Sequence, residues 1–382
     1  MLMKIISKIL LALSILLCSS CVTEFIPKTT EDQEMLVVEG LITNRPEAYA
    51  IKLSRPFHLG LNNVSHPLSG CNISVSDDKG NSFIFSETAP GTYTSDPTKF
   101  QGVIGRIYTL HISTNFTNNV LNYQSVPVQL KPVPPIDSVY YEKVTFTEGP
   151  DGFPSQQGAK IYLDTHDPAN QCKFYRWEYY ETWEFRLPYM VPNNTCWLSN
   201  NSDVINIKNT SAIAEAKVDK YPLTLITNST DRLRERYSIM VYQYSLNEDE
   251  YLYWEKLQNI SEQVGGLYDI IPSSIPSNIN CIDDPNQKVL GYFSVSASSS
   301  KRIFIHDNFA GVLSQFNDKT CIADTVFGAS NGPIAWLGVN VWVIINHTAP
   351  PPSYRVLTRT KGCYDCTVRG TNIKPDFWVG DK

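Results

Sequence analysis

The chain has 382 residues, of which only 18% are charged, below the roughly 25% of average globular proteins. Its 38 acidic residues outnumber 32 basic ones, and the resulting net charge of −6 argues against nucleic-acid binding, which needs a basic surface. Abundant Tyr, Asn, Ser and Thr with few charges are typical of an extracytoplasmic β-protein, and the length suits two or three domains of about 100–200 residues.

The first twenty residues have the layout of a secretory signal peptide. Lys4 and Lys8 give a basic start, and the apolar run over 9–17 is shorter than the roughly 20 residues that span a bilayer. Removal of residues 1–20 leaves 30 of the 32 basic residues against 38 acidic ones, a net charge of −8 for the mature chain.

Cys21 follows the small residues Ser19 and Ser20 at the end of this leader. A lipoprotein signal peptidase requires this arrangement, because the cysteine takes a diacylglyceryl group, becomes the new N-terminus and is then N-acylated. We therefore predict lipidation at Cys21, and this covalent lipid is the only cofactor expected. Cys18, where leucine is more usual, is the weaker candidate anchor, and an ordinary signal peptide is the alternative.

The mature chain is predicted to begin with a lipidated tether over 21–34, because this stretch is polar. Residues 71–75 then alternate apolar and polar side chains, 77–81 form a turn, and Phe83 and Phe85 resume the alternation, as in a hairpin. Further short segments of this kind predict an N-terminal β-sandwich over 35–130, immunoglobulin-like or transthyretin-like in type.

Prolines at 132, 134 and 135 remove amide donors and predict a domain boundary. A second, larger β-sandwich region is expected over 136–382, and its clearest strand is 175–184, where aromatic residues alternate with Arg176 and Glu178. One helix near 247–264, with apolar residues at helical spacing, is expected to pack on this sandwich. A cysteine-containing loop forms the C-terminal part. The predicted fold class is therefore mainly β.

Seven cysteines remain beyond the leader, and in an oxidising compartment such cysteines tend to pair, although an odd number cannot all do so. They are Cys71, Cys172, Cys196, Cys281, Cys321, Cys363 and Cys366. Cys71, on the apolar face of an alternating strand, is the expected buried free thiol.

Cys363 and Cys366 have three interpretations. We favour disulfides that fasten the C-terminal loop, from either cysteine to Cys281 or Cys321; a redox pair and a zinc site are the alternatives. Zinc would need a second pair of ligands, which the six scattered histidines do not supply, so no metal site is predicted.

No Gly-x-Ser-x-Gly, phosphate-loop or His-Glu-x-x-His motif is present, so no catalytic residue is predicted and the protein is not expected to be an enzyme. Trp183, Tyr189 and Trp197 are the candidates for a partner-binding surface, because Trp and Tyr dominate the energetics of interfaces. Ordinary core packing is their alternative role.

Several segments together carry a family likeness: 36–43, 134–138, 175–178, 289–293, and 363–366 with 374–378. In this order, after a lipoprotein leader, they resemble the Bacteroidota outer-membrane lipoproteins grouped as domain of unknown function 4249. The resemblance implies a place in envelopes rich in TonB-dependent transporters, and it implies no activity.

The expected function is a lipid-anchored accessory or ligand-binding subunit of the outer membrane, associated with a TonB-dependent receptor. A lipid-anchored hydrolase with scattered active-site residues and a purely structural envelope protein are the alternatives. The periplasmic or surface-exposed face stays open, because Glu24 is the only acidic residue close to Cys21.

Overall fold

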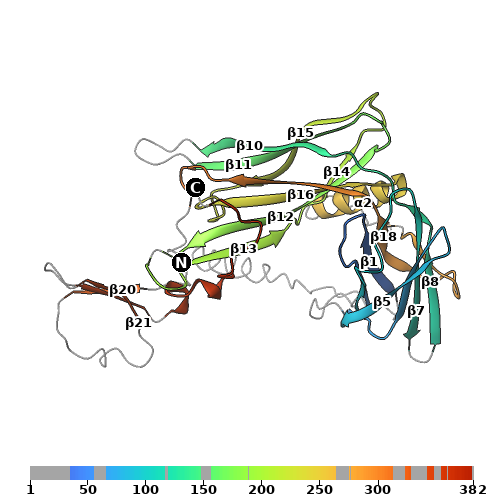
Figure 1. Cartoon of the computed structure of the whole chain (residues 1–382), viewed down its shortest axis with the longest axis horizontal. Helices are drawn as coiled ribbons and strands as arrows, with labels where there is room; N and C mark the ends of the chain where they lie inside the picture. The colour runs from blue at the N-terminus through green and yellow to red at the C-terminus, as the bar shows by residue number, and fades with distance from the viewer. Residues whose placement is uncertain are drawn as a thin grey trace, which may run out of the picture.

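Short strands with alternating side chains dominate the fold, which is mainly β, as predicted. The computed structural model describes residues 35–55, 66–116, 119–147, 156–187, 189–263, 275, 277–312, 323–327, 342–347, 354–358 and 360–380. The predicted signal peptide, Cys21 with its tether, and Cys321 lie outside the described residues. The described strands form two β units and a small C-terminal sheet (Figure 1).

The first β unit surrounds a core of alternating apolar residues, which include Leu36, Val38, Ile73 and Val75. The predicted hairpin is present, with Ile73 opposite Phe85. The strands run in the spatial order β17-β8-β7-β4-β5-β6-β2-β1-β18. Their bounds are β1 (Leu36–Ile42), β2 (Ala50–Arg55), β3 (His66–Pro67), β4 (Asn72–Asp77), β5 (Ser82–Ala89), β6 (Thr92–Ser95), β7 (Ile107–Phe116), β8 (Asn119–Ser125), β9 (Val128–Gln129), β17 (Ile279–Cys281) and β18 (Val289–Val295).

Two late strands complete this unit. β18 pairs with β1 in parallel, and β17 pairs with β8 in antiparallel orientation, at the opposite end of the strand order. The predicted division at 131–135 is therefore wrong in one respect, because residues 279–295 were assigned to the second region. The physical reason is that β1 and β8 would otherwise expose unpaired backbone groups, which these late strands satisfy.

The parallel pairing of β1 with β18 depends on a glycine. Gly291 has a φ of +85°, and a Cβ added there would lie 2.0 Å from the carbonyl oxygen of Val38. Only glycine allows both this backbone conformation and this close approach of the two strands.

The second β unit is a sandwich of two sheets around an aromatic-rich core that includes Tyr175, Trp177 and Tyr179. One sheet has the order β10-β11-β15; the other has β13-β12-β16-β19, with β14 beside β12 (Figure 1). The bounds are β10 (Ile136–Thr147), β11 (Gln156–Asp167), β12 (Phe174–Arg186), β13 (Thr195–Asn201), β14 (Asn206–Asn209), β15 (Ala216–Ile226), β16 (Tyr237–Ser245) and β19 (Ser298–Ile305).

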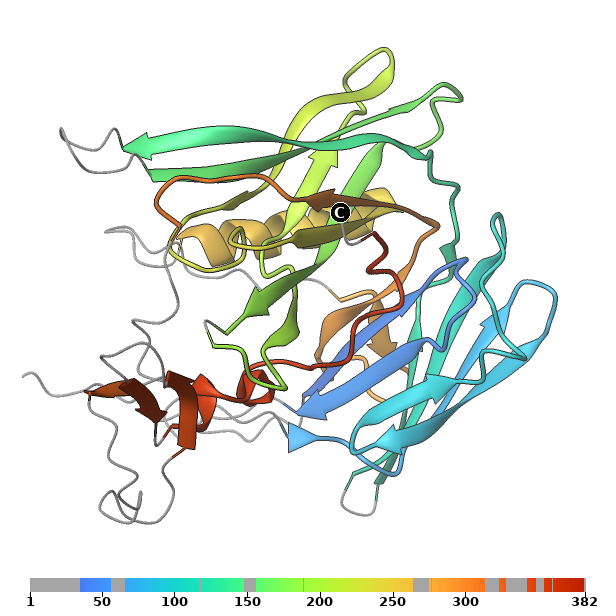
Figure 2. The same cartoon turned by 60° about the vertical axis from the view of Figure 1, so that its left-hand side comes forward.

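Helix α2 (Glu248–Gln263) lies where the two units meet, as Figures 1 and 2 show. Its bounds agree with the predicted helix near 247–264. Three acidic residues occupy its first turn, where the helix dipole favours negative charge. An apolar cluster joins Tyr251 of α2 to Tyr244 of β16, and Leu41 of the first unit packs against it. The junction is therefore packed on one side of the helix.

The C-terminal part contains a three-stranded sheet and a segment that returns to the second unit. The sheet has the order β20-β22-β21, with β20 (Ala323–Phe327), β21 (Trp342–His347) and β22 (Tyr354–Thr358). Residues 360–380 then run along β13, where Trp197 and Thr371 exchange backbone hydrogen bonds of 2.8 and 3.0 Å. Trp378, only 1% exposed, fastens the end of this segment.

Candidate binding cleft between the two β units

A cleft of about 510 Å³ lies between the first unit and α2. A concave site lined by apolar side chains together with a few charged groups is typical of a ligand pocket. Its lining comes from β1, β2 and β18 on one side and from β12 and α2 on the other. The lining side chains with aromatic or charged groups are Glu39, Lys52, Arg176, Glu178, Tyr253, Trp254 and Tyr292.

Arg176 is the buried charge of this cleft. It belongs to β12 and its side chain is only 7% exposed, while that of Glu178 is 40% exposed. The Arg176 guanidinium donates to the Glu178 carboxylate at 2.9 Å and lies 4.1 Å from the centroid of the Trp254 ring. A buried cation needs such compensation, because desolvation of an unpaired charge costs several kcal/mol.

Glu250 lies beside Arg176 and is fully buried. Burial raises the pKa of the Glu250 carboxyl, against lowering contributions from the Ser294 hydroxyl and the Arg176 guanidinium. Its neighbour Trp254 donates its indole N–H to Glu250 at 3.4 Å. Burial also raises the pKa of Tyr253 to about 12.

Two further pockets share the lining residue Glu178 with this cleft. One, of about 510 Å³, extends over the outer face of β12 and β16, and the other, of about 130 Å³, extends toward residues 202–206. Glu178 lines all three pockets. We call the three together the junction groove.

The first unit also contributes charge to the outer part of the junction groove. Arg45 pairs with Glu47 at 2.7 Å, and the Arg45 guanidinium lies 4.4 Å from the ring centroid of Tyr242. Tyr180 and Asn201 line the same pocket. The groove is therefore lined by Tyr, Asn and Ser together with acidic and basic side chains, most of which are paired.

Sequence reasoning missed the junction groove. Alternation along β12 correctly placed Arg176 and Glu178 opposite the aromatic core residues, but it gave no sign that another part of the chain covers them. The available signal was the helix, whose Trp254 stood out as an apolar residue at helical spacing. Its contact with Arg176 depends on how the two units meet, which local patterns do not specify.

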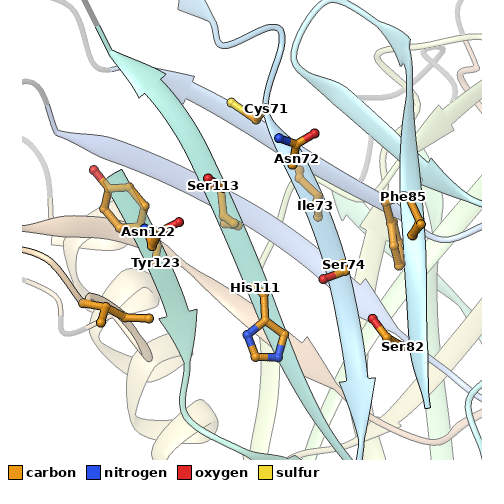
Figure 3. Close-up of a pocket in the computed structure, with 13 residues that line it drawn as sticks. Cys71, Asn72, Ile73, Ser74, Ser82, Phe85, His111, Ser113, Asn122 and Tyr123 are labelled. Atoms are coloured by element: carbon orange, nitrogen blue, oxygen red, sulfur yellow. The ribbon is translucent and has the colours of Figure 1, made fainter. Parts of the chain in front are cut away.

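A second hollow, of about 540 Å³, lies on the outer face of the first unit. Figure 3 shows its side chains on neighbouring strands, with Asn72 and Ser74 on β4, His111 and Ser113 on β7, and Ser82 on β5. No Asp, Glu, Lys or Arg lines it. This surface therefore offers hydrogen-bonding groups without charge.

His111 and Ser76 lie 2.8 Å apart beside this hollow, which brings a hydroxyl and an imidazole within reach of proton transfer. The amide groups of β4 are engaged by β5 and β7 on both sides, so they are not free to stabilise an oxyanion. Among the described residues, no carboxylate is hydrogen-bonded to His111. The pair therefore lacks the other parts of a hydrolytic site.

The predicted partner-binding residues have different environments. Trp183 is 6% exposed and belongs to the core of the second unit, so its prediction as a surface anchor is wrong. Trp197 is half-buried and packs edge-on against Trp378, 6.3 Å between ring centroids. Tyr189 is half-exposed in the loop between β12 and β13, and its partner-binding role stays a prediction.

The cysteines confirm the general disulfide interpretation and correct its details. Cys366 is bonded to Cys196, with 5.8 Å between their Cα atoms, and Cys363 is also disulfide-bonded. Cys281, a predicted partner, is instead a buried free thiol within the first unit. Cys71 is free and buried, as predicted.

Within the ranges that the structure describes, no group of three or more His, Cys, Asp or Glu side chains is arranged to hold a metal ion. No helix in those ranges is long and apolar enough to cross a membrane.

Comparison with protein families gives one match. The model of a family described as a domain of unknown function, DUF4249, matches residues 22–302, which is more than half of the chain. The match confirms the family resemblance predicted from the sequence, and it includes both sides of the junction groove. No curated protein matches the chain.

Proposed function

We propose that this chain, which belongs to the DUF4249 family, is a lipid-anchored binding subunit of the outer membrane that works beside a TonB-dependent transporter. The observation that carries the proposal is the junction groove, in which three pockets meet at Glu178 between two β units. The ion pair of the buried Arg176 with the partly exposed Glu178, together with aromatic side chains, gives this groove the polar and apolar groups that a binding site needs.

The leader and Cys21 support the anchoring part of the proposal. A basic start, a short apolar run, two serines and a cysteine follow one another in the order that lipoprotein processing needs. Two or three acyl chains give stable attachment, since each buried methylene contributes about 0.8 kcal/mol.

The short tether supports the proposed role as an accessory subunit of a transporter. Residues 21–34 span at most about 50 Å even when fully extended, so the β units would stay close to the bilayer. Such confinement raises the effective concentration of the groove near a membrane-embedded partner. A ligand captured there would be held close to the mouth of a transporter.

Anchoring is tested by feeding cells labelled palmitate. The wild-type protein and the Cys18→Ala variant should both carry label, and Cys21→Ala should carry none. Label that persists in Cys21→Ala but disappears in Cys18→Ala would move the anchor to Cys18.

The partner is tested by gentle detergent extraction from crosslinked cells, with an affinity tag placed after Lys382. A TonB-dependent receptor should be recovered in near-stoichiometric amount, and Cys21→Ala should lose it. Recovery of the wild-type lipoprotein alone at native expression would contradict the accessory role.

A further inference from the structure

We propose that the junction groove binds an extended peptide, which adds as a strand to the outer edge of β13. The inference rests on the proposed binding function and names the class of ligand. Three features of the groove support it: its elongated form, its balanced charges and the unpaired backbone groups at its rim.

The form of the groove favours a chain over a compact ligand. Its pockets extend from α2 and β1 past Glu178 to the end of β13, where Asn201 and Ser202 line the outer pocket. A strand advances about 3.3 Å per residue, so a few residues in extended conformation would follow this course.

The charges favour a ligand without high net charge. Arg176 pairs with Glu178, Arg45 pairs with Glu47, and Glu39 is the cross-strand partner of Lys52. Asp203 also lines the groove, so four acidic side chains face three basic ones, and no part of the lining presents the excess of cations that a nucleotide or another polyphosphate requires.

The aromatic rings favour a peptide over a glycan. A sugar binds protein by stacking on an open ring face. Trp254 and Tyr242 each carry a guanidinium over the ring, from Arg176 at 4.1 Å and from Arg45 at 4.4 Å. On these two rings, one face is therefore already occupied by a guanidinium of the protein and is not open to a sugar.

The outer edge of β13 supplies the N–H and C=O groups that would hydrogen-bond to an added strand. Trp197 exchanges both of its backbone hydrogen bonds with Thr371, so the amide and carbonyl of residue 197 point away from β12. Backbone direction alternates along a strand, and the corresponding groups of Ser199 and Asn201 therefore point the same way. Ser202 agrees with this alternation, because its amide donates to Tyr179 of β12 at 2.8 Å.

In the described part of the chain, no backbone group pairs with this outer edge at Ser199 or Asn201. The C-terminal segment occupies the edge at Trp197 and ends its pairing there. An added strand would continue the pairing from that point along the outer edge to Asn201, which lines the rim of the outer pocket, and this is the β-augmentation mode of peptide recognition.

The test uses the full mature lipoprotein in detergent micelles. The probes are an unfractionated tryptic digest of casein, as a source of varied unstructured peptides, and maltoheptaose, as an uncharged glycan. Retained peptides are identified by mass spectrometry, one of them is synthesised, and its affinity is measured by calorimetry.

Asn201→Pro is the decisive variant. It removes the one outward-pointing N–H of residue 201 and no ladder hydrogen bond to β12, and an edge strand tolerates proline at such a position. Binding of the synthetic peptide should weaken at least tenfold. Asn200→Ala, whose backbone faces β12 and whose side chain is exposed, is the matched control and should stay within twofold of wild type.

Hydrogen exchange on the wild-type protein gives an independent measurement if the proline variant does not fold. Bound peptide should slow exchange of the Ser199 and Asn201 amides at least tenfold. Peptide binding without this protection, or unaffected by Asn201→Pro, would overturn the proposed site. Binding of maltoheptaose alone would overturn the ligand class and leave the binding function intact. Co-purification of a transporter without any peptide binding would overturn this inference alone.

Discussion

The side chain of Asn278 closes the first β unit by pairing with the backbone of Phe293. Its amide donates to the Phe293 carbonyl at 2.8 Å, and its oxygen accepts from the Phe293 N–H at 2.9 Å. Asn278 precedes β17, and Phe293 lies in β18, so the pair joins the two ends of the strand order. A side chain, in place of a ladder of backbone hydrogen bonds, thus connects the start of β17 to β18.

Asn278→Ala should destabilise the protein by about 2–4 kcal/mol, because two buried backbone groups of Phe293 lose their partners. Urea unfolding followed by far-UV circular dichroism measures this. Asn280→Ala is the matched control, since its side chain is exposed, and it should change stability by less than about 0.5 kcal/mol. Equal effects of the two changes would contradict the role given to Asn278.

Gly291→Ala should prevent β18 from pairing with β1. The new methyl group would meet the Val38 carbonyl oxygen at 2.0 Å, and the positive φ adds strain. We expect a loss of about 4 kcal/mol or more. Gly80→Ala separates the two causes, because Gly80 has a φ of +84° and nothing within 4 Å, so only about 1–2 kcal/mol should be lost. If Gly291→Ala lost much less unfolding free energy than this, β18 would separate easily from β1.

Removal of the Cys196–Cys366 bridge should loosen the C-terminal segment from β13. The bridge joins residues 170 apart in sequence, and a disulfide of this kind typically contributes about 2–4 kcal/mol. The double variant Cys196→Ala/Cys366→Ala should show that loss in thermal or urea unfolding, and Cys281→Ala should retain the bridge on non-reducing peptide mapping. A mapped bridge from Cys366 to Cys281 would refute the assignment.

Stability should depend on pH through Glu250. Its pKa is raised in the folded protein, so folding favours the protonated carboxyl. This contribution to stability is complete below the ordinary carboxyl pKa, and it is lost as the pH rises through the raised value. Glu250→Gln should therefore match the wild type near pH 4 and exceed it in unfolding free energy near pH 7.

Glu248→Gln is the control for this comparison. It removes an exposed acid from the same first turn of α2, so it loses the same helix-dipole interaction without changing a buried group. Its pH profile should follow that of the wild type. If Glu250→Gln also followed the wild type between pH 4 and 8, burial would not control the ionisation of Glu250.

Local patterns in the sequence predicted much of the fold. Alternation marked the hairpin around Ile73 and Phe85, and helical spacing marked α2 within a residue at each end. Side-chain periodicity reports which face of an element is buried, so these elements were accessible from the sequence.

The pairing of distant elements was not accessible in this way. β18 shows no regular alternation of apolar and polar residues, and nothing in its sequence distinguishes β1 as its partner. The same limit applies to Cys196, which was set aside in favour of Cys281, and to Arg176, whose burial requires α2 and the first unit to meet over β12.

The return of β17 and β18 to the first unit affects the order in which the protein can fold. A chain that emerges from its N-terminus delivers β1 to β9 well before the two strands that complete their sheet. Until residue 295 is available, β1 and β8 have exposed edges that can pair with other chains. The first unit can therefore complete its sheet only after most of the second unit has been synthesised. A fragment ending near residue 135 is expected to aggregate.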